Sequence, residues 1–104
     1  MASYSLKTKK GVGNLLQDIH KIRASAYDRS DYGAIEILVD LKRAIKQANL
    51  TDRQREALYY IYIRGVTQQE AAHKMGLKTG KTVFHYKDTA LQKIAEVYDS
   101  WDYS

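Results

Sequence analysis

Residues 78–87 gather basic side chains with no acid among them, and the first acidic residue that follows is Asp88. The basic residues of this segment are Lys78, Lys81, His85 and Lys87. A lysine ammonium can meet a phosphate oxygen or the acceptor edge of guanine, and the hydroxyl and methyl groups of Thr82 suit a base edge. The segment therefore favours contact with a nucleic acid over the alternative that its lysines only keep a surface helix in solution.

The chain around this segment predicts two short helices joined by a tight turn. Thr67 and Glu70 form the TxxE pattern of a helix start. Gly76 supplies the left-handed backbone that a steep turn needs, and Thr79 can cap a second helix over about 80–98. This layout is that of a helix-turn-helix, which directs the start of its second helix into the major groove of DNA.

Two groups of residues follow as candidates for DNA contact. The start of the second helix presents backbone N–H groups that suit a phosphate, and the first helix of such motifs crosses the DNA backbone. The candidates are Gln68, Gln69, Lys78, Thr79, Gly80, Lys81, Thr82, Phe84, His85 and Lys87. Arg53, Arg55 and Arg64 are secondary candidates, because arginines on a capped surface helix are more often solvated.

The rest of the chain also predicts helices, so the expected fold is all-α with about five helices. Apolar residues recur every three or four positions over 14–27 and 30–48. Ser30 can cap the second of these helices and Asn49 can end it in a left-handed conformation. The inward-facing residues are expected to be Leu15, Ile19, Ile22 and Ala26, then Ala34, Leu38, Leu41, Ile45 and Ala48.

A further helix precedes the helix-turn-helix, because Thr51 and Gln54 form a capping box and Gly65 ends the apolar pattern. The expected organisation is a flexible basic arm at 1–13, a helical pair at 14–49, the helix-turn-helix unit packed on that pair at 50–98, and an acidic aromatic tail at 99–104. Trp101 in the tail either folds back on the core or belongs to a docking peptide. The length suits one compact domain.

Composition limits the class of protein. Seventeen Lys and Arg against twelve Asp and Glu give a net charge of +5, which suits a polyanion partner but is also found in small basic proteins that bind none. Cysteine is absent, which excludes disulfides and thiolate metal sites. No stretch approaches the ~20 apolar residues of a membrane span, and the first residues lack a signal sequence. We expect a cytoplasmic protein without a membrane partner.

Catalytic and cofactor sites are not predicted. His20, His73 and His85 lie far apart without carboxylates at ligand spacing, so no metal is expected. The GKT at 80–82 resembles part of a phosphate-binding P-loop, but only three residues separate Gly76 and Gly80, and a helix rather than a strand precedes them. The protein is expected to be no enzyme and to need no cofactor.

Residues 50–96 resemble region 4 of bacterial sigma factors and the small sigma-like regulators common in phages and Gram-positive bacteria. The resemblance rests on LTDRQREALYYIYIRGVTQQEAAHKMGL followed by TVFHYKDTALQKIAE. It implies a transcription regulator, with RNA polymerase as a second partner. One residue, assigned to Lys78, is added in the turn, and Gly80, Lys81, Thr82 and Phe84 stand where the family more often has arginines and glutamates. Base preference therefore does not carry over.

The leading hypothesis is a sequence-specific DNA-binding regulator of transcription whose recognition helix spans about 80–98. A homodimer fits it, since operators are usually read twice. One alternative is a protein-interaction module that binds RNA polymerase or another sigma factor, and another is a phage packaging protein such as a small terminase subunit. Nothing in residues 1–49 resembles a promoter-melting helix, so a stand-alone initiation factor is not expected.

Overall fold

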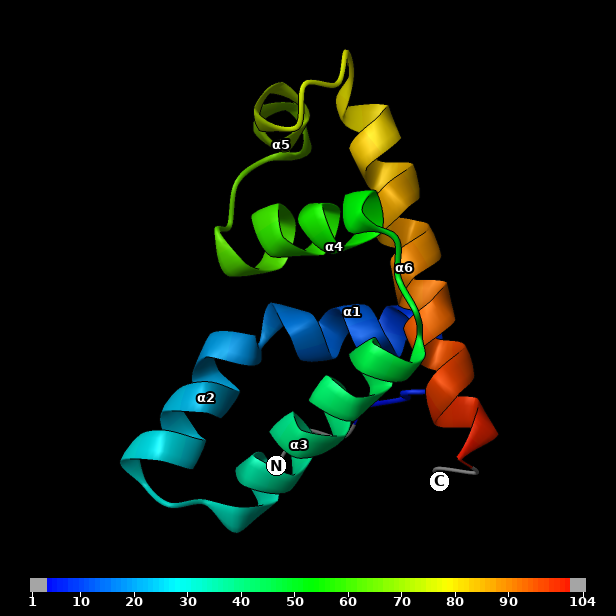
Figure 1. The fold of residues 1–104 in the computed structure, drawn as a ribbon. Coiled ribbons are helices and arrows are strands. Elements are labelled where there is room, and N and C mark those ends of the chain that lie inside the picture. The colour runs from blue at the N-terminus through cyan, green and yellow to red at the C-terminus, as the bar shows by residue number, and fades with distance from the viewer. Residues whose placement is uncertain (1–3, 102–104) are drawn as a thin grey trace.

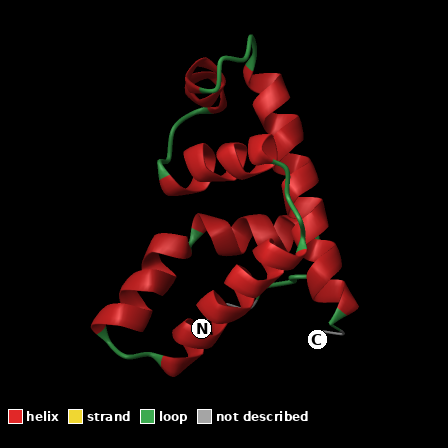
Figure 2. Cartoon of the chain, viewed as in Figure 1, coloured by secondary structure: helices red, strands yellow, loops and turns green. Residues whose placement is uncertain are grey.

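The computed structural model describes residues 4–101, which form helices joined by short loops and contain no strand (Figures 1 and 2). The helices are α1 (Lys9–Gln17), α2 (Ile19–Asp28), α3 (Tyr32–Gln47), α4 (Asp52–Leu58), the π-helix η1 (Tyr59–Ile63), α5 (Gln68–Lys74) and α6 (Gly80–Ser100). The all-α prediction is confirmed, although the described residues hold six α-helices rather than about five. None of these helices is long and apolar enough to cross a membrane.

Helix α6 is the spine of the molecule, and it contacts α1, α3, α4 and α5 (Figure 1). Helix α5 and the turn after it lie at one end of the molecule, while the hairpin of α2 and α3 lies at the other. The long α6 therefore presents its first turns beside α5 and its last turns beside the N-terminal helices.

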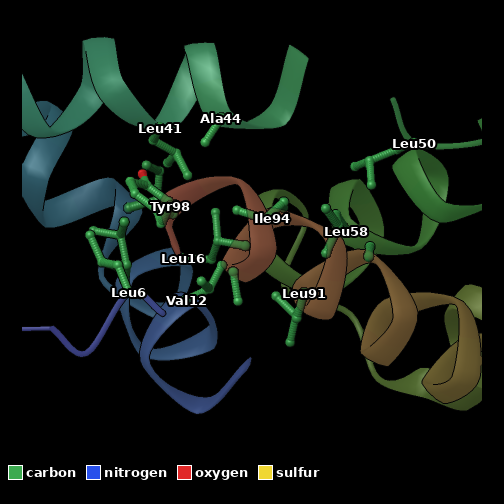
Figure 3. Close-up of a cluster of buried hydrophobic side chains, with 14 residues drawn as sticks. Leu6, Val12, Leu16, Leu41, Ala44, Leu50, Leu58, Leu91, Ile94 and Tyr98 are labelled. Carbon is green, nitrogen blue, oxygen red and sulfur yellow. The ribbon is translucent and has the colours of Figure 1, made fainter. Parts of the chain in front are cut away.

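The larger of two apolar clusters lies where α1, α3, α4 and α6 meet (Figure 3). Its members are Leu6, Val12, Leu15, Leu16, Ile19, Leu41, Ala44, Leu50, Leu58, Ala90, Leu91, Ile94, Ala95 and Tyr98. Val12, Leu15, Ile94 and Tyr98 are among the largest fully buried side chains. The N-terminal helices and the last turns of α6 thus share one core.

A smaller cluster supports the helix-turn-helix. It consists of Ala57, Ala71, Ala72, Met75 and Val83. Because three of the five are alanines, α5 can approach α4 and α6 closely. Leu77 of the turn and Tyr86 of α6 pack against this cluster and close it.

The prediction of a flexible arm at 1–13 is wrong for residues 4–13, while residues 1–3 lie outside the described part. Leu6 is buried, and α1 starts at Lys9 because the Thr8 hydroxyl accepts a hydrogen bond from the Gly11 N–H at 3.0 Å. Tyr4 donates its hydroxyl to Asp18 at 2.7 Å. The lysines of this segment are exposed, and in the sequence they hid the helical spacing of its apolar residues.

The helix expected over 14–27 is divided at Asp18, which ends α1 and starts α2. Ser30 is not the cap of α3, because it adopts a left-handed φ of 50°. Asp31 caps α3 instead, accepting the Ala34 N–H at 3.1 Å. This bond, together with one from the Ser25 hydroxyl, holds the pKa of Asp31 below its usual value.

The other helix ends follow the predicted caps more closely. Asn49 has a φ of 52°, and the capping box of Thr51 and Gln54 is complete in both directions. At the C-terminal end α6 continues to Ser100, and the Trp101 ring folds back on the core with its Nε1 donating to Gln47 Oε1 at 3.0 Å. Residues 102–104 of the expected tail lie outside the described part.

Candidate nucleic-acid interface

The turn between α5 and α6 is fixed by backbone hydrogen bonds. Gly76 has a φ of 71°, and its N–H donates to the His73 carbonyl at 3.2 Å. The Leu77 N–H donates to the Ala72 carbonyl at 2.8 Å. These two bonds form a Schellman motif, whose apolar contact comes from the Leu77 side chain in the smaller cluster. The turn therefore holds α6 at a defined angle to α5.

Helix α5 begins at its predicted cap. The Thr67 side chain accepts the Glu70 N–H at 3.1 Å. Glu70 does not complete the box in the usual way, because its carboxylate accepts the Thr67 hydroxyl at 3.2 Å.

The first residue of α6 packs directly on the start of α5. A Cβ on Gly80 would lie 3.1 Å from backbone atoms of Gln68 and Gln69, closer than most side chains tolerate. Glycine is thus favoured here by the close approach of two helices. As a result Gln68 is half-buried against α6, while Gln69 is exposed beside it.

The predicted side-chain cap of α6 is not formed. Thr79 has the extended backbone of a cap residue, but its hydroxyl makes no bond to the helix N–H groups and lies 3.4 Å from the Thr82 hydroxyl. Without that cap, the N–H groups of the first turn of α6 can donate to an anion.

The lysine-bearing face at the start of α6 faces solvent. Lys78, Lys81 and His85 are exposed and make no ion pair with the described part of the chain. Phe84 is 39 % exposed beside them, and the Lys87 ammonium lies over its ring, 4.8 Å from the ring centroid. The structure leaves six of the predicted residues exposed and covers the other four in part. The exposed ones are Gln69, Lys78, Thr79, Lys81, Phe84 and His85, and the partly covered ones are Gln68, Gly80, Thr82 and Lys87.

Helix α1 contributes to this surface, which the sequence did not predict. Lys9 Nζ lies 3.1 Å from Asp88 Oδ2 and so offsets the first acid of α6. A cleft of about 380 Å³ lies between the two helices, and Lys10 lines it together with Lys9 and Lys87. Lys9 and Asp88 are 79 residues apart, so no local pattern in the sequence could have paired them.

The secondary candidates differ in their surroundings. Arg53 donates from Nη1 to the Met75 carbonyl at 2.7 Å and lies 3.7 Å from Glu56, so it ties α4 to the turn. Arg55 points toward the Leu50 carbonyl at 3.5 Å, and Arg64 is exposed at the end of η1. Over residues 4–101, no three His, Asp or Glu side chains gather in a way that could hold a metal ion.

The short capped helix, the fixed turn and the exposed basic start of α6 define a helix-turn-helix. Residues 48–96 match the family model described as Sigma-70, region 4. This segment, from the end of α3 through most of α6, is similar to the helix-turn-helix of sigma region 4. No curated protein and no solved structure matches the chain.

Proposed function

We propose that this protein is a sequence-specific DNA-binding regulator of transcription that places the first half of α6 in the major groove. The observation that carries the proposal is the exposed cluster of Lys78, Lys81 and His85 at the start of α6, just after the hydrogen-bonded turn. This cluster has no acidic partner among the described residues. Lysines without acidic partners keep their full charge for a phosphate backbone. The family match supports DNA binding and a role in transcription.

The residues divide by what they can contact. Lys78, in the turn, and Lys81, in the first turn of α6, reach toward phosphates or guanine edges. The half-exposed Phe84 ring offers an apolar surface for a thymine methyl group. Gln69 is exposed at the start of α5, which crosses the DNA backbone in this class of motif.

The experiment is selection of duplexes from a random-sequence pool by the wild-type protein and by the Phe84→Ala variant. We expect the wild type to enrich one motif and the variant to bind with relaxed preference at the position facing Phe84. Enrichment of no motif, with equal retention of all duplexes, would leave non-specific binding only and refute the proposal.

A second function is favoured by a separate apolar groove. The groove has a volume of about 250 Å³ and lies where η1 meets α1 and α3. Tyr59 and Ile63 on its rim are 46 % and 37 % exposed. Such a surface suits a protein partner, and RNA polymerase interaction is general in the family.

Pull-down with RNA polymerase tests the second function. Retention of polymerase by the wild type, and its loss in Tyr59→Ala, would support a polymerase-binding module. A large ring in light scattering, with no motif enriched, would favour the packaging alternative over both.

A further inference from the structure

Helix α3 has a second apolar stripe on its outer side. Its buried side carries Ala34, Leu41 and Ala44. Tyr32, Ile35 and Val39 recur at three and four residues on another face, where they are 78 %, 37 % and 53 % exposed. The stripe therefore leaves apolar surface exposed on α3, and this surface can pack against another molecule.

The charges beside the stripe change sign along the helix. Glu36 lies in the first half of α3, whereas Arg43 and Lys46 lie in the second half, and all three are exposed. Arg43 also lies 3.7 Å from Asp40 of its own helix and its guanidinium lies over the Trp101 ring, 4.9 Å from the centroid, but 60 % of its side chain stays exposed. A helix with this polarity is complementary to a copy of itself that runs in the opposite direction.

We propose that the stripe of Tyr32, Ile35 and Val39 pairs α3 with α3 of a second copy of this chain, antiparallel about a two-fold axis near Val39. In that pairing Glu36 faces Arg43 of the second copy on the same edge of the contact. The Tyr32 ring faces Lys46 of the second copy, whose ammonium can stack on it. A parallel pairing would instead set Glu36 against its own copy and is disfavoured.

The position of α3 makes this pairing compatible with the rest of the molecule. The α2–α3 hairpin lies at the opposite end from α5 and the turn (Figure 1). Both copies therefore keep the start of α6 uncovered. The pairing follows from α3 alone and does not depend on the DNA-binding proposal.

Sedimentation equilibrium from about 5 μM to about 500 μM tests the pairing, because one helix pair should give a dimer of micromolar affinity. Val39→Lys sets two ammonium groups against each other near the axis, so we expect the dimer to weaken by about tenfold or more. Val39 is exposed, so the variant should keep its helical circular dichroism. Gln92→Lys adds the same charge at an exposed position of α6 and should leave the dimer unchanged.

Charge exchange tests the antiparallel direction. Glu36→Arg alone sets the new guanidinium against Arg43 of the second copy, and Arg43→Glu alone sets two glutamates together, so each variant should self-associate more weakly. A mixture of the two variants restores ion pairing across the contact and should form a heterodimer. A wild type that stays monomeric throughout, a dimer unaffected by Val39→Lys, or a mixture no better than its components would each overturn the proposal.

Discussion

The hydroxyl of Tyr4 shows how one hydrogen bond fastens the N-terminal segment to the core. It donates to Asp18 at 2.7 Å, at the junction between α1 and α2. Burial of the phenol, together with the bond to the Asp18 carboxylate and its charge, raises the pKa of Tyr4 to about 12. The neutral phenol is therefore favoured in the folded protein.

Tyr4→Phe should lower the free energy of unfolding at pH 7 by about 1 kcal/mol, the usual net value of such a bond. Because the folded pKa lies above the unfolded one, the contribution is full below pH 10 and is lost as the pH rises toward 12. Urea unfolding of both proteins across this range measures it. A difference that stays constant to pH 12 would contradict this role for Tyr4.

At the scale of elements, two glycines hold the helix-turn-helix for different reasons. Gly76 needs its left-handed backbone but has open space around it, whereas Gly80 has no such backbone and needs the space beside α5. The requirement at Gly76 therefore concerns the backbone conformation of one residue. The requirement at Gly80 concerns the packing of α6 on α5.

Gly76→Ala should cost roughly 1 kcal/mol of stability through backbone strain, and should spare DNA affinity once the protein is folded. Gly80→Ala should instead displace the start of α5 by a few tenths of an ångström and weaken DNA binding more than its loss of stability explains. Gly65→Ala is the matched control, because Gly65 has a φ of 66° and open space as well. Thermal melts and DNA titrations compare the three, and equal DNA affinity for all would contradict the packing role of Gly80.

The sequence predicted those elements whose ends are marked by local chemistry. The structure has the predicted helix caps at Thr51, with Gln54, and at Thr67. It also has the predicted left-handed backbone at Gly76 and Asn49. The break at Asp18 and the order of residues 4–13 depend on tertiary contacts, such as the bond from Tyr4 and the burial of Leu6. The candidate site divides in the same way. The sequence predicted the candidate residues at the start of α6, which are close together in the chain, but it did not predict the lysines of α1, which lie near α6 only in the folded protein.

At the scale of the whole molecule, α6 joins both apolar clusters. Ile94 belongs to the larger cluster and Val83 to the smaller one, and both are fully buried. The exposed Lys81 lies in the first turn of the same helix, and the exposed Lys78 lies just before it. The proposed DNA-binding face should therefore unfold together with the N-terminal helices, as one unit.

Ile94→Ala should cost about 2–5 kcal/mol, and Val83→Ala somewhat less because fewer methyl groups are removed. Each variant should still unfold in a single transition, with the tryptophan fluorescence of Trp101 and the helical circular dichroism changing together. Two separate transitions in Val83→Ala, with Trp101 unaffected by the first, would show that the helix-turn-helix unfolds alone.

DNA binding by the lysines at the start of α6 is the property on which the proposed function depends. The dependence of DNA affinity on salt concentration tests it most directly, because each lost phosphate contact lowers the magnitude of the slope by about one. Lys81→Ala should lower the slope in this way, while Lys21→Ala, which removes an exposed lysine from α2, should leave it unchanged. Equal slopes for wild type, Lys78→Ala and Lys81→Ala would contradict DNA contact through these lysines.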